Sequence, residues 1–185
     1  DLGSLPPVVQ AYLRYTGVVG KPRVASFRVR FTGALRSTPQ SAWMPSEAVQ
    51  VSAVDPPARL FLVESTWHGV PFAAFHRYEQ ARATMEVRLF STFGVVDARG
   101  REMDQSETVT VFNDMCLLAP ASLVGAAVHW TAVDERTVDA AFTNGGQTIR
   151  ARLTFGADGA LQNFVSSDRY RSTDGRTYDA LPWST

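Results

Sequence analysis

The sequence has one cysteine, no net charge and no long apolar run, and each shortage excludes a class of protein. Cys116, as the single cysteine, cannot form an intramolecular disulfide, which excludes a small disulfide-stapled domain. The 18 basic residues balance the 18 acidic residues, so no whole-chain field attracts nucleic acid or anionic lipid. No apolar run approaches the ~20 residues that a membrane-spanning helix needs.

What is present is an ordinary globular composition. The chain has 185 residues, of which 45% are hydrophobic and 19% are charged, enough for one domain with a substantial core over residues 1–185. It begins at Asp1 rather than methionine, and it stops shortly after Trp183, where a sheet would expose an unfinished edge. We therefore expect the natural protein to extend beyond both ends.

Most of the chain has the period-two pattern of β-strands. Phe27, Val29 and Phe31 alternate with arginines from the start of the first such segment, which predicts a half-buried strand with the arginines facing solvent. We expect Val29 to be buried and Arg30 to be exposed. Further strands are predicted at 47–54, 59–67, 72–78, 85–96, 137–143, 147–155 and 160–170.

Two segments have helical character instead. Pro6 and Pro7 suit the first turn of a helix that ends near Gly17. A central helix is predicted to begin at Asp104, with Glu107 completing a capping box, and to end before Pro120. The predicted fold is mainly β (α+β): a curled antiparallel sheet or half-barrel of about 8–10 strands, with the two helices covering its concave face.

A curled sheet whose concave face is covered by helices would enclose an apolar cleft that could hold a ligand. Its walls would be inward-facing strand residues, and the central helix would close it. The expected wall residues are Phe27, Val29, Phe31, Leu60, Leu62, Met85, Val87 and Leu89. The expected lid residues are Phe112, Met115 and Cys116, with Asn113 and Asp114 as polar candidates in the same cleft.

Nucleophilic catalysis and metal binding have weaker support in the sequence. Cys116 could form a nucleophilic set with a histidine, but its position among Met115 and leucines is typical of a small buried hydrophobe. The three histidines, His68, His76 and His129, lack the spacing of a metal motif, so no metal and no cofactor is predicted.

The arginines allow two interpretations. Arg28, Arg30 and Arg36 could contact phospholipid head groups, or they could form the solvated outer face of a sheet. Because aromatic rings and arginines alternate along the strands, they lie on opposite faces, which argues against a nucleic-acid platform.

Three segments together resemble a known family. These are Leu5-Pro-Pro with Tyr12-Leu-Arg-Tyr-Thr-Gly17, then Phe112-Asn-Asp-Met-Cys-Leu-Leu-Ala-Pro120, and Ser167-Asp-Arg-Tyr170 with Pro182-Trp-Ser-Thr185. They are similar to an uncharacterised bacterial family, a domain of unknown function. The resemblance implies a chain that continues past Thr185 and, in many members, an N-terminal membrane segment. The strand–helix order is similar to the half-barrel of LolA- and LppX-type lipoprotein carriers, which is a fold-level analogy.

The predicted function is therefore binding or carriage of a hydrophobic ligand, lipid or lipidated partner without catalysis. The predicted location is membrane-associated or extracytoplasmic, near a removed N-terminal anchor. Two alternatives stay open: a structural or interaction module with a filled core, and an enzyme that uses polar groups around Asn113 and Asp114.

Overall fold

The computed structural model describes residues 2–172 and 174–185. The chain is mainly β, with antiparallel sheets and two α-helices, as the sequence predicts. Its elements in chain order are α1 (Pro7–Tyr15), β1 (Ser26–Leu35), β2 (Met44–Val54), β3 (Pro57–Trp67), β4 (Val70–Glu79), β5 (Arg82–Leu89), β6 (Phe93–Arg99), α2 (Arg101–Leu118), the 3₁₀ turn η1 (Pro120–Leu123), β7 (Val128–Ala132), β8 (Thr137–Asn144), β9 (Gln147–Phe155), β10 (Leu161–Ser166), β11 (Tyr170–Arg171), β12 (Asp179–Ala180) and β13 (Trp183–Ser184).

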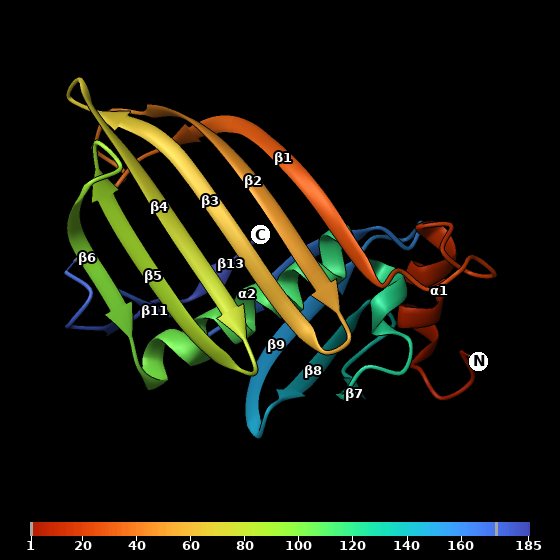
Figure 1. The fold of residues 1–185 in the computed structure, drawn as a ribbon. Coiled ribbons are helices and arrows are strands. Elements are labelled where there is room, and N and C mark those ends of the chain that lie inside the picture. Colours follow the sequence, from red (N-terminus) through yellow and green to blue (C-terminus); the bar gives the residue numbers. More distant parts are fainter. Residues whose placement is uncertain (1, 173) are drawn as a thin grey trace.

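The strands divide between two main sheets rather than forming one. The first has six strands in sequence order, β1 to β6, because each strand turns back beside the previous one. The second has five strands in the order β13-β10-β9-β8-β7, and β11 and β12 form a separate pair. The long strands of the first sheet arch over α2, and the second sheet lies on the other side of that helix (Figure 1).

Strand pairing fixes which residues of the six-stranded sheet face α2. Opposed residues share a face, and Val29, Gln50, Phe61, His76 and Met85 are opposed in turn from β1 to β5. Val29 is half-buried, and the next residue along β1 points outward into solvent. The predicted orientation of β1 is confirmed, with Val29 half-buried rather than fully buried.

In β3 the predicted orientation is wrong. Phe61 and Val63 face inward, whereas Leu60 and Leu62 face outward with 44% and 37% of their surface exposed. Both faces of β3 carry apolar side chains, so alternation in the sequence gives no phase. Pairing with β2 sets the phase, and it places Phe61 opposite the inward-facing Gln50.

The predicted strand at 85–96 is a hairpin made of β5 and β6. Phe90 and Ser91 form its turn, and both have left-handed backbone angles, with φ of 51° and 57°. Hairpin turns of this kind usually have glycine or asparagine at the positive-φ positions, and these residues make the turn recognisable in a sequence. The turn here has neither residue, so the sequence pattern hides it.

Helix α2 lies between the two sheets and is buried along most of its length. It begins at Arg101, three residues before the predicted start, so the backbone N–H of Asp104 already donates to Gly100 O within the helix (2.9 Å). The predicted capping box is therefore wrong. The Asp104 carboxylate accepts from the backbone N–H of Ala83 (2.6 Å) and pairs with Arg82 (3.2 Å).

Helix α1 does not cover the concave face of the six-stranded sheet, contrary to the predicted arrangement. Its Tyr12 ring packs against Phe155 of β9, with ring centroids 5.4 Å apart, and the Tyr12 hydroxyl donates to Cys116 O at the end of α2. Of the helices in the described residues, α2 is the one that lies beneath the six-stranded sheet. Within the described chain, no helix combines the length and apolar character needed to cross a membrane.

Candidate functional site

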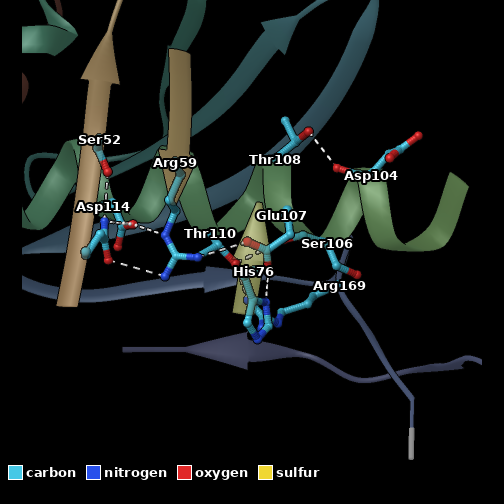
Figure 2. Close-up of polar contacts among 11 residues, drawn as sticks. Ser52, Arg59, His76, Asp104, Ser106, Glu107, Thr108, Thr110, Asp114 and Arg169 are labelled. Atoms are coloured by element: carbon cyan, nitrogen blue, oxygen red, sulfur yellow. Dashed lines mark hydrogen bonds and ion pairs between the residues drawn. The ribbon is translucent and has the colours of Figure 1, made fainter. Parts of the chain in front are cut away.

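A buried polar network lies where α2 passes beneath β2, β3 and β4 (Figure 2). Its centre is the guanidinium of Arg59, which comes from the start of β3 and points toward the helix. Arg59 Nη1 lies 3.0 Å from Glu107 Oε2, and Arg59 Nε lies 2.9 Å from Asp114 Oδ2. The two acidic residues are two helical turns apart, so α2 presents both to one side chain.

Gln50 of β2 completes the hydrogen bonds of Arg59. The Gln50 amide donates to Asp114 Oδ2 (2.7 Å) and to Ser52 Oγ (3.0 Å), while its oxygen accepts from Arg59 Nη2 (3.3 Å). The Arg59 guanidinium also lies 4.4 Å above the centre of the Phe61 ring. All three guanidinium nitrogens of Arg59 therefore have partners, as a buried arginine requires.

His76 of β4 lies beside the same network. Its Nδ1 atom is buried 3.5 Å from Glu107 Oε1, a close contact rather than a hydrogen bond, and Nδ1 has no hydrogen-bond partner among the described residues. The side chain is 19% exposed, so the exposed part of the ring belongs to its other atoms. His76 therefore joins the buried network to the accessible part of the inner sheet face.

The two network carboxylates have opposite pKa shifts. Burial raises the pKa of Glu107, but His76, Arg59 and Arg169 outweigh burial and lower it to about 2. Burial also raises the pKa of Asp114, and there Arg59 and Gln50 only partly offset the effect. Glu107 is consequently ionised at neutral pH, and its negative charge holds the Arg59 guanidinium in place.

The low pKa of Glu107 predicts an acid-sensitive stability. A carboxyl whose pKa falls on folding stabilises the protein fully above its ordinary pKa of 4.5 and loses that contribution as pH falls toward about 2. We expect the free energy of unfolding to fall by about 3 kcal/mol over this range on account of this group. Urea unfolding followed at several pH values would measure it.

Glu107→Gln is the matched variant for this prediction, because glutamine keeps the shape but cannot titrate. Its stability should be lower than wild type at pH 7 and should depend less on pH between 4.5 and 2. Equal pH dependence in the variant and the wild type would contradict the assignment to Glu107.

The predicted wall and lid residues separate into groups. Phe27, Val29, Phe31, Met85, Val87 and Leu89 all face inward, whereas Leu60 and Leu62 do not. Phe112 faces the second sheet, where its ring stacks on Phe142 with centroids 5.1 Å apart. Phe112 and Cys116 therefore contribute to the core on the far side of α2.

The enclosed cleft expected between α2 and the sheet is filled. Phe27 and Met115 line a cavity of only about 10 Å³ there, which is room for one water molecule at most. A larger open hollow of about 710 Å³ lies at the opposite end of β2, β3 and β4, with Ser46, Ser65 and Phe72 among its lining. Its volume lies in the range that small ligands occupy.

The two polar candidates point to different places. Asp114 belongs to the Arg59 network, whereas Asn113 Oδ1 accepts a hydrogen bond from Thr185 Oγ1 at the end of the chain (2.9 Å). Cys116 is fully buried, and burial raises the pKa of its thiol, which disfavours the thiolate that a nucleophile needs. No cluster of three possible metal ligands occurs within residues 2–172 and 174–185.

The sequence pattern missed most of the network. Gln50, Arg59 and His76 stand on strands that read as apolar or alternating, and nothing in the sequence shows that their side chains meet. The sequence pattern assigns Glu107 only to a predicted capping box. The available signal is a glutamate and an aspartate seven residues apart in the same predicted helix, a spacing that places both on one helical face.

The chain belongs to a family of unknown function, DUF6544, whose sequence model matches residues 1–185. This confirms the resemblance to an uncharacterised family. Comparison with curated proteins and with solved structures finds no match.

Proposed function

We propose that the protein binds a hydrophobic small molecule, such as a lipid acyl chain, on the open part of the inner face of its six-stranded sheet. The carrying observation is a set of inward-facing apolar side chains that no other element fully covers. We call this set the inner apolar face: Phe31, Phe61, Phe72, Val87 and Leu89. Phe31 keeps 38% of its surface exposed, and the other four are half-buried.

Physical reasoning supports this use of the surface. Exposed apolar area costs about 25 cal/mol per Å², so a concave sheet face rich in phenylalanine favours an apolar occupant. The arching strands give the face its curvature, and α2 lies beneath them (Figure 1). The predicted similarity to half-barrel lipoprotein carriers adds a fold-level analogy.

A pair of substitutions on opposite faces tests the proposal. Phe31→Asp places a charge on the inner apolar face, and Leu62→Asp places one on the outer face at nearly equal exposure, 38% against 37%. We expect Phe31→Asp to weaken binding of a fluorescent acyl-chain probe about tenfold or more, because an aromatic contact of about 1.5–3 kcal/mol is lost. Leu62→Asp should leave binding unchanged.

Fluorescence titration would measure the affinities, and circular dichroism would establish that each variant is folded. Mass spectrometry of an organic extract of the purified protein would show any lipid that it carries. Equal weakening by both variants, or no saturable binding by wild type, would reject the inner face as a ligand site. The protein would then be better described as a structural module with a filled core.

A further inference from the structure

We propose that Arg169 binds the anionic head group, a carboxylate or phosphate, of an amphipathic ligand whose chain lies on the inner apolar face. This inference rests on the proposed function. Arg169 follows β10 and reaches into the network region beside α2 and His76 (Figure 2). It is a half-buried arginine that feels the charges of Glu107 and Asp114 but is in direct contact with neither carboxylate.

The contacts of Arg169 differ in kind from those of Arg59. Its guanidinium donates to Thr110 Oγ1 and lies over the Trp183 ring, 4.0 Å from the ring centre. In the described part of the chain, no carboxylate oxygen lies within 4.0 Å of it. Burial lowers the pKa of Arg169, yet an arginine side chain stays protonated in proteins, so the positive charge persists.

The nearby carboxylates are committed elsewhere. Glu107 contacts Arg59 and His76, and Asp114 contacts Arg59 and Gln50. Glu107 is near enough for Arg169 to lower its pKa, but the attraction acts over a distance rather than through a bond. A partly desolvated cation with no contacting anion favours an anionic ligand.

The geometry also suits an amphiphile. The Trp183 ring lies against the guanidinium, whereas the paired hydrogen bonds that arginine makes to carboxylate or phosphate run along the edge of the group rather than through its face. Trp183 Nε1 is a further buried donor with no partner among the described residues. His76, which is adjacent to Phe61 at 6.0 Å between ring centres, marks the border between these polar groups and the inner apolar face.

Four ligands of equal chain length separate the head group from the chain: dodecanoate, dodecyl phosphate, dodecanol and dodecyltrimethylammonium. Isothermal titration calorimetry below the micelle concentrations would give each affinity. We expect wild type to bind one or both anions about tenfold more tightly than dodecanol, and the ammonium compound least tightly. The stronger of the two anions identifies the head-group class.

Arg169→Gln should abolish the preference for the anions while leaving the affinity for dodecanol unchanged. Arg152→Gln is the control, because Arg152 is exposed and pairs with Asp139 on the surface; it should keep the preference. If Arg169→Gln is unfolded by circular dichroism, Arg169→Lys decides, since lysine keeps the charge but lacks the planar fork and should reduce the preference.

The outcomes are distinct. Equal binding of dodecanol and both anions by wild type would overturn the head-group site and leave the apolar site standing. An unchanged preference in the folded Arg169 variant would overturn the role of Arg169. Failure of all four compounds to bind would overturn this inference together with the proposed function.

Discussion

Replacing Arg59 by methionine is expected to lower the free energy of unfolding by about 3–5 kcal/mol, because removal of one partner leaves buried charge without compensation. Arg59 is 6% exposed and is the shared partner of Glu107 and Asp114. Its loss removes a charge that lowers the pKa of both carboxylates, and it leaves Glu107 and Asp114 buried without that partner. Urea or thermal unfolding would measure the change.

Two further variants locate the cause. Arg59→Met combined with Glu107→Gln should be more stable than Arg59→Met alone, because the second change removes the stranded charge. Arg152→Met breaks a surface pair with Asp139 and should cost about 1 kcal/mol or less, since exposed ion pairs contribute little. A loss in Arg59→Met no larger than in Arg152→Met would contradict the structural role of the network.

The second large effect is expected from Phe112→Ala, at about 3–5 kcal/mol, the usual cost of deleting a fully buried phenylalanine ring. Phe112 is 0% exposed and lies in an aromatic cluster with Phe142, Phe164 and Trp130, at 5.1, 5.7 and 6.1 Å between ring centres. Because this cluster joins α2 to the second sheet, its loss would weaken the contact between helix and sheet. Denaturant unfolding checks the value.

Leu117→Ala on the same helix is the control for Phe112→Ala. Leu117 is 48% exposed, so the cavity term is absent and the expected change is about 0.5 kcal/mol. Ligand binding provides a second readout. Because Phe112 faces away from the inner apolar face, a folded Phe112→Ala protein should bind the acyl-chain probe as wild type does, and a specific loss of binding would contradict that orientation.

Local sequence patterns were enough to predict three features of the fold. The alternation from Phe27 to Phe31 set the orientation of β1, the paired prolines before Val8 set the start of α1, and Pro120 set the end of α2. In each case the physical cause lies within one segment, since side-chain direction in a strand and the missing N–H of proline require no distant partner.

Other features depend on pairing between separate segments of the chain. The orientation of β3 follows from its hydrogen bonds to β2, because a strand with apolar residues on both faces has no preferred phase of its own. The network of Arg59, Glu107 and Asp114 exists only because α2 passes beneath β3. Arg169 reaches the same place from more than fifty residues further along the chain, and no local pattern encodes such a meeting.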